Sequence, residues 1–174
     1  LSQHNYEEAV RAFDNQLELE PEHLLSKYNR GVCYMKLEKY KLSLIDFNFI
    51  IEREPKNATF ISERGLAKFF TGDSNGAMAD FNLAVELDPN YGYRYAIRGF
   101  IKDKLGDTKG GIQDYYKAIE LDPEDAVTYN NLGLLEEKLG WKDKAQQNFS
   151  RADQLTAKQE ETLQAFKELF PDEE

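Results

Sequence analysis

Residues 58–91 read ATFISERGLAKFFTGDSNGAMADFNLAVELDPNY, and features of this stretch return along the chain at a fixed distance. Four of the five prolines lie 34 residues apart, namely Pro21, Pro55, Pro89 and Pro123. Four glycines keep the same spacing: Gly31, Gly65, Gly99 and Gly133. Small residues recur at Ala9, Ser43, Ala77, Gly111 and Ala145, each followed four residues later by an aromatic residue: Phe13, Phe47, Phe81, Tyr115 and Phe149. One register shared by several residue classes indicates an internal repeat.

Each repeat is predicted to form two helices. Residues 58–71 form one periodic stretch and residues 74–87 a second, and Gly72 and Asp73 separate them. Pro89 ends the unit, because proline disfavours helical backbone at the residue before it. Helices of about 14 residues are marginal alone in water, so each must bury a face against its neighbours. We expect Gly31 and Ser43 at the closest approach of two helices, with the aromatic residue one turn further along filling the space beside it.

These features resemble the tetratricopeptide repeat family. The resemblance rests on Gly65, the spacing from Ala77 to Phe81, Ala84 and the closing Leu87-Asp88-Pro89, and the best local match runs from Tyr129 to Ala152. It covers roughly residues 1–157 and implies an all-α, right-handed α-solenoid of helix-turn-helix units. The sequence departs from the family where the first helix of a unit usually carries tryptophan: Lys27, Ile61, Tyr95 and Tyr129 stand there.

The repeat count predicts the organisation of the chain. A truncated first repeat is expected at 1–23 and full repeats at 24–57, 58–91, 92–125 and 126–157. Residues 5–18 carry the pattern of a second helix without most of its first, and the chain begins at Leu1 rather than methionine. We therefore expect a fragment or a processed product.

Residues 158–174 are expected to form a capping helix and an acidic tail. Thr156-Ala-Lys-Gln159 has the pattern of a capping box, which would open this last helix. Leu163, Phe166 and Phe170 form an apolar stripe along it, and Pro171 with Asp172-Glu173-Glu174 would end it. Terminal repeats need a polar outer cover, which this helix would provide.

Arginine and aspartate vary together between the repeats. Arginine precedes the recurring glycine at Arg30, Arg64 and Arg98, but Leu132 stands there in the last unit. Aspartate precedes the recurring aromatic residue at Asp46, Asp80 and Asp114, but Asn148 replaces it in the same last unit. This co-variation predicts three partly buried ion pairs within repeats, since arginine is rarely buried unless it is paired. Binding of an anionic ligand by the arginines is the alternative.

The family resemblance implies that the first helices line a concave groove. The candidate partner-binding residues on those helices are Tyr28, Asn29, Val32, Leu66, Phe69, Phe70, Tyr93, Ile97, Phe100, Asn130, Asn131 and Leu134. Lysines and carboxylates such as Lys104, Lys138 and Asp103 are expected at the rim. Apolar anchors inside a polar rim are typical of protein interfaces. The alternative is that several of these side chains pack between adjacent helices.

The groove predicts a scaffold that binds a protein or peptide partner through apolar anchors. Related repeats that clamp the C-terminal carboxylate of chaperones use lysine, asparagine and arginine on successive first helices. The matching positions here are Tyr28, Val32, Glu63, Tyr93 and Ile97, so a carboxylate-clamp partner is not expected. The rival prediction is a structural module that forms homo-oligomers through the ends of the repeat array.

Composition argues against other classes of function. The 174 residues carry 22 Lys+Arg and 32 Asp+Glu, a net charge of −10, which disfavours nucleic acid and anionic membrane surfaces as partners. No apolar run approaches the ~20 residues that span a bilayer. With His4, His23 and Cys33 scattered, no catalytic, metal or cofactor site is predicted. The compartment is not determined by the sequence; the cytoplasm is favoured over other compartments.

Overall fold

The computed structural model describes residues 3–169, and side chains as far as residue 167. Over this range the chain is helical: α1 (Gln3–Leu19), α2 (Leu24–Lys36), α3 (Tyr40–Arg53), α4 (Ala58–Phe70), α5 (Ser74–Leu87), α6 (Gly92–Lys104), α7 (Thr108–Leu121), α8 (Ala126–Lys138) and α9 (Lys142–Leu169). The bounds of α5 match the second stretch expected from residues 58–91, and α4 ends one residue before the end of the first. No strand occurs among the described residues, and the all-α fold class is confirmed. None of these helices has the length and apolar character needed to cross a membrane.

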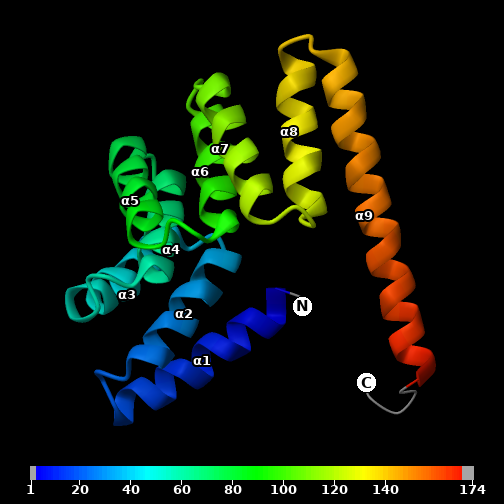
Figure 1. The fold of residues 1–174 in the computed structure, drawn as a ribbon. Coiled ribbons are helices and arrows are strands. Elements are labelled where there is room, and N and C mark those ends of the chain that lie inside the picture. Colours follow the sequence, from blue (N-terminus) through cyan, green and yellow to red (C-terminus); the bar gives the residue numbers. More distant parts are fainter. Residues whose placement is uncertain (1–2, 170–174) are drawn as a thin grey trace. The chain divides into compact units, whose positions relative to one another are not determined.

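The chain divides into two compact units, one containing α1–α5 and the other α6–α9. Within each unit, helices adjacent in sequence pack side by side (Figure 1). The first helices of consecutive repeats are also in contact: α2 with α4, and α6 with α8. Second helices start after a residue with left-handed backbone: Glu38, Gly72, Gly106 and Gly140. This turn explains the glycines at 72, 106 and 140, because glycine adopts a positive φ without a steric penalty.

Helix pairs are closely packed around the recurring glycines. A side-chain Cβ added at Gly31 would lie 2.8 Å from Cε1 of Phe47, so the aromatic ring of α3 fills the space at this crossing. In α6 and α7 the approach is closer, because Gly99 and Gly111 face each other: a Cβ at either would lie under 3.0 Å from the other's carbonyl oxygen. The two helices of a pair therefore approach each other through two glycines in α6–α7, and through a glycine and an aromatic ring in α2–α3.

The last helix differs from its prediction. No separate helix opens after Thr156, because α9 runs without a break from Lys142 to Leu169. The Thr156 hydroxyl donates a hydrogen bond to the carbonyl oxygen of Ala152 one turn earlier, as threonine does inside a helix. Ala157 stands where proline ends the earlier repeats, and alanine favours propagation of the helix. The predicted capping box is therefore wrong.

The apolar stripe on this helix is also placed differently from the prediction. Leu163 is 54% exposed and Phe166 is 46% exposed, so neither is packed onto the array as the expected cover. Phe170, Pro171 and the acidic tail lie outside the described residues. The C-terminal half of α9 therefore presents apolar side chains at the surface.

Candidate functional site

The predicted partner-binding residues fall into two sets, six on α2 and α4 and six on α6 and α8. In the first set, Tyr28 and Val32 pack partly against the buried cluster that contains Phe47, so they contribute to the core. Phe70 is 49% exposed and stacks on Tyr40, with ring centroids 4.7 Å apart. The alternative of packing between helices thus describes part of this set, while Phe70 remains available at the surface.

A charged pair lies within the same face of the first unit. Glu63 on α4 is half-buried, and burial raises the pKa of its carboxyl, an effect that the nearby ammonium of Lys36 on α2 opposes. Lys36 and Glu63 stand at positions that the repeat relates to Lys104 and Asn131 in the second unit. The same place in the array therefore has different chemistry in the two units.

In the second set, exposed apolar side chains surround a small pocket between α6 and α8. Its volume is about 210 Å³. The walls and rim are formed by Phe100, Asp103, Lys104, Asn131, Leu134 and Lys138. Phe100 is 40% exposed and Leu134 is 49% exposed. Three of the predicted residues are thus brought together with the lysines and the aspartate expected at the rim.

The floor of this pocket is formed by Leu135 and by Tyr115, an aromatic residue that the repeat pattern predicts beside a helix crossing. Tyr115 has no exposed surface, and its hydroxyl has no hydrogen-bond partner among the described residues. Burial, with a further contribution from the charge of Asp103, raises the pKa of Tyr115. The sequence feature that could have indicated a polar group here is the tyrosine itself, because the other repeats carry phenylalanine at this position.

Asp103, which lines the pocket from α6, is hydrogen-bonded to residues of α7 and α8. Its Oδ1 accepts hydrogen bonds from the Thr108 hydroxyl and from Lys138 Nζ, each 2.6 Å long. Burial opposes ionisation of this carboxyl, but the hydrogen bonds from Lys138 and Thr108 lower its pKa below the usual value. Asp103 is therefore a carboxylate at neutral pH, and no described hydrogen bond reaches its Oδ2.

The three predicted ion pairs are confirmed. Each arginine forms a bidentate contact with the aspartate of its own repeat: Arg30–Asp46 at 2.9 and 2.6 Å, Arg64–Asp80 at 2.8 and 2.7 Å, and Arg98–Asp114 at 2.8 and 2.6 Å. The carboxylates are 1–6% exposed. Pairing to Asp46 raises the pKa of Arg30 despite its burial. This arrangement supports a structural role for the arginines.

The ion pairs extend to neighbours that the co-variation did not reveal. Lys68 contacts Asp80 at 2.8 Å and Lys102 contacts Asp114 at 2.9 Å, which gives each of these aspartates two cations. Arg30 instead reaches back to Asp14 on α1 at 2.7 Å. The second cation adds counter-charge to the buried carboxylates of Asp80 and Asp114, whereas Asp46 is buried with Arg30 alone.

The last repeat keeps the polar cluster with altered charges. Glu136 occupies the position of Lys102 and is fully buried. It accepts hydrogen bonds of 2.7 Å from the Tyr116 hydroxyl and from the Asn148 amide. Burial and this bond to Glu136 raise the pKa of Tyr116 to about 12. Loss of arginine and aspartate is therefore accompanied by a change of lysine to glutamate.

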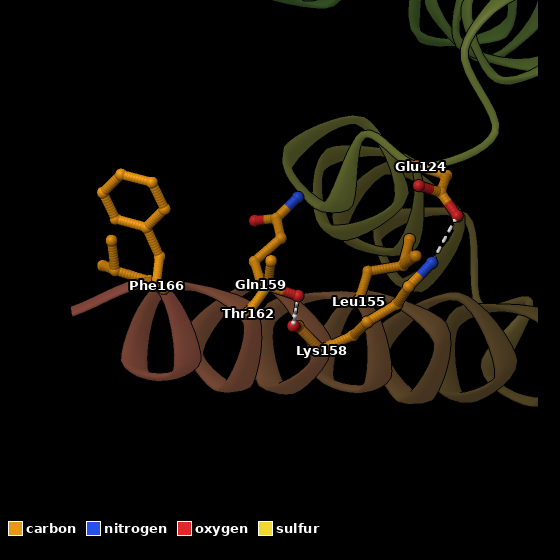
Figure 2. A pocket seen from close by; sticks show the side chains of 7 residues that line it. Glu124, Leu155, Lys158, Gln159, Thr162 and Phe166 are labelled. Carbon is orange, nitrogen blue, oxygen red and sulfur yellow. Dashed lines mark hydrogen bonds and ion pairs between the residues drawn. The ribbon is translucent and has the colours of Figure 1, made fainter. Parts of the chain in front are cut away.

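A larger pocket, of about 580 Å³, lies along the C-terminal half of α9. Figure 2 shows that Leu155, Gln159 and Phe166 project from one side of the helix, and that Lys158 reaches Glu124 near the start of α8. The Lys158–Glu124 ion pair is 2.7 Å long. The described residues hold no group of three or more histidine, cysteine, aspartate or glutamate side chains that would bind a metal ion.

Stacked helix pairs of this kind define a helical-repeat solenoid protein. Family models described as tetratricopeptide repeat match residues 60–91, 94–125 and 115–147. The chain belongs to the tetratricopeptide repeat family. None of the curated proteins matches it.

Several solved structures share the fold. MamA from residue 41 onwards, of Desulfovibrio magneticus RS-1, is 21% identical, with 88% of this chain and 87% of that chain covered and a TM-score of 0.75. YrrB, described as a TPR protein with an unusual peptide-binding site, is 21% identical with a TM-score of 0.66, over 94% and 84% of the two chains. The first TPR of Spaghetti (RPAP3), bound to the HSP90 peptide SRMEEVD, is 26% identical with a TM-score of 0.61, over 67% and 93%.

Proposed function

We propose that this protein is a protein–protein interaction scaffold that binds peptide or helical segments of a partner through the exposed faces of its first helices. The main support is the exposure of Phe100 and Leu134 beside the pocket between α6 and α8. An apolar core inside a polar rim is typical of protein interfaces. Two structural neighbours, YrrB and the Spaghetti repeat, are described as peptide-binding or peptide-bound, which agrees with this class of function.

Charge reversal at this face is expected to abolish partner binding. The double variant Phe100→Glu/Leu134→Glu places two carboxylates where apolar anchors would dock, so we expect affinity for the partner to fall at least about tenfold. The measurement is affinity capture followed by mass spectrometry and a titration with the captured partner. The control Ile45→Glu/Leu83→Glu introduces the same charges at exposed apolar positions on the second helices α3 and α5. Equal binding by both double variants would contradict the proposal.

The partner is not expected to be a chaperone tail of the carboxylate-clamp type. Tyr28 and Val32 are partly packed into the core, and Glu63 adds a negative charge where a clamp requires a cation or an amide. The peptide SRMEEVD, which is bound to the Spaghetti repeat, therefore serves as a negative control. A clear titration with this peptide would contradict the exclusion.

Self-association is a second candidate function, and the ends of the array support it. Ala9 and Phe13 on α1 are half-exposed, whereas their equivalents Ser43 and Phe47 are fully buried. Phe166 is exposed beside the pocket on α9. If the ends pair between copies, light scattering should detect a dimer or larger species that Phe166→Glu converts to monomer and Phe100→Glu does not. A monomeric wild-type protein at high concentration would contradict this candidate.

A further inference from the structure

The pocket between α6 and α8 combines apolar walls with a polar floor. Phe100 and Leu134 supply half-exposed apolar surface on opposite sides, one from each helix. Tyr115 and Asp103 line the same space, and the Tyr115 hydroxyl oxygen is buried. A volume of about 210 Å³ is below the range of small-molecule sites, so the pocket suits a single side chain.

The Tyr115 hydroxyl is not required for packing. The equivalent residues Phe47 and Phe81 are 0–1% exposed and fill their helix crossings without a hydroxyl. Tyr115 is as fully buried, yet its oxygen has no hydrogen-bond partner among the described residues. A buried polar group without a partner destabilises the fold. Phenylalanine would satisfy the fold at this position, which suggests that the hydroxyl serves a ligand.

The hydrogen-bonding groups restrict the chemistry of that ligand. The Tyr115 hydroxyl offers a donor, and Oδ2 of Asp103 offers an acceptor that no described hydrogen bond uses. A carboxylate tip would be repelled by Asp103, and an ammonium tip would offer no acceptor to Tyr115. A phenol hydroxyl satisfies both groups, because it accepts one hydrogen bond and donates another. An aromatic ring would also pack against Phe100 in a favourable tilted or offset arrangement.

We propose that this pocket binds a tyrosine side chain of the partner, with its ring between Phe100 and Leu134 and its hydroxyl bonded to Tyr115 and Asp103. The inference rests on the proposed function and specifies the residue that the scaffold recognises. The corresponding site in the first unit has Met35 in place of Asp103, Phe47 in place of Tyr115, and Phe70 in place of Lys138. That site lacks both polar groups of the floor, so tyrosine selectivity belongs to the second unit.

The test uses N-acetyltyrosinamide, N-acetylphenylalaninamide and N-acetylglutaminamide as probes in amide NMR titrations of the full chain. The tyrosine probe should shift the signals of Phe100, Asn131 and Leu134 and bind about three- to tenfold more tightly than the phenylalanine probe. Tyr115→Phe should remove this preference and raise the melting temperature of the free protein by about 2–4 °C. Phe81→Tyr, which adds a hydroxyl at the equivalent position of another repeat, serves as the matched control and should not change the preference.

Each other outcome overturns the inference. Equal binding of the tyrosine and phenylalanine probes, tighter binding of the glutamine probe, or no shift at the pocket would each exclude a tyrosine site. A preference that persists in Tyr115→Phe would exclude the proposed role of that hydroxyl. Partner capture that is lost in Phe100→Glu/Leu134→Glu but retained in Tyr115→Phe would overturn this inference and leave the proposed scaffold function standing.

Discussion

Replacing Asp80 with alanine is expected to lower the free energy of unfolding by about 3–5 kcal/mol. The carboxylate is 5% exposed and receives two hydrogen bonds from Arg64 and an ion pair from Lys68. Its removal leaves two cations close together in a partly buried site with no counter-charge. Urea unfolding followed by circular dichroism measures the loss. Glu86→Ala, an exposed carboxylate on the same helix, should change stability by no more than about 0.5 kcal/mol.

The last repeat provides a direct test of this explanation. The triple variant Arg64→Leu/Lys68→Glu/Asp80→Asn copies into α4 and α5 the residues found at Leu132, Glu136 and Asn148. Asn48 on α3 is the equivalent of Tyr116 on α7 and already contacts Arg64 at 3.5 Å, so its amide is placed to donate to the new carboxylate. We expect the triple variant to recover most of the stability lost in Asp80→Ala. A wild-type unfolding curve for Asp80→Ala would contradict a structural role for the pair.

The Arg–Asp pairs were predictable because the repeats serve as an alignment within one chain. Arg30, Arg64 and Arg98 each accompany an aspartate, and Leu132 accompanies its loss, so the partners are identified by the exception. The same comparison did not reveal Glu136. Glu136 has the opposite charge to Lys68 and Lys102, which stand at the same position of the earlier repeats. That Glu136 takes their place in the polar cluster is visible only from the hydrogen bonds that Tyr116 and Asn148 donate to its carboxylate.

Helix bounds were predictable where local breaking residues act. Gly72 and Asp73 end one helix and begin the next because a left-handed turn and an N-cap side chain are both local requirements. At Thr156 the capping pattern was present, yet α9 continues, because without proline or glycine nothing stops the helix from propagating. Capping residues alone therefore do not predict a helix start.

The candidate site was predictable only in part, because its floor depends on tertiary packing. The positions of Phe100, Asn131 and Leu134 follow from the face of a first helix. Tyr115 belongs to α7, and its contribution to a pocket between α6 and α8 requires the three-helix packing to be known. Tyr28 and Val32 depend on tertiary packing in the same way, since a small rotation of a helix moves a side chain from the surface toward the core.

Gly99→Ala is expected to destabilise the protein by about 1–3 kcal/mol, although alanine favours a helix by about 1 kcal/mol. The added methyl group would lie 2.9 Å from the carbonyl oxygen of Gly111 and 3.1 Å from Cβ of Asp114. Neither atom belongs to a flexible side-chain end, so α6 and α7 must move apart and displace the carboxylate that Arg98 binds. Thermal unfolding of the variant measures this cost.

Gly133→Ala is the matched comparison, because its methyl group meets a movable neighbour. The added Cβ would lie 2.6 Å from Cε1 of Phe149, a closer contact than at Gly99, but Phe149 is only half-buried and its side chain can turn. The helix propensity of alanine then offsets most of the strain, and we expect a change within about 1 kcal/mol. If contact with the backbone makes glycine necessary, Gly99→Ala must destabilise the protein more than Gly133→Ala, despite the longer contact distance at Gly99. The reverse order would show that the aromatic rings, and not the helix backbones, set the distance between the two helices of a pair.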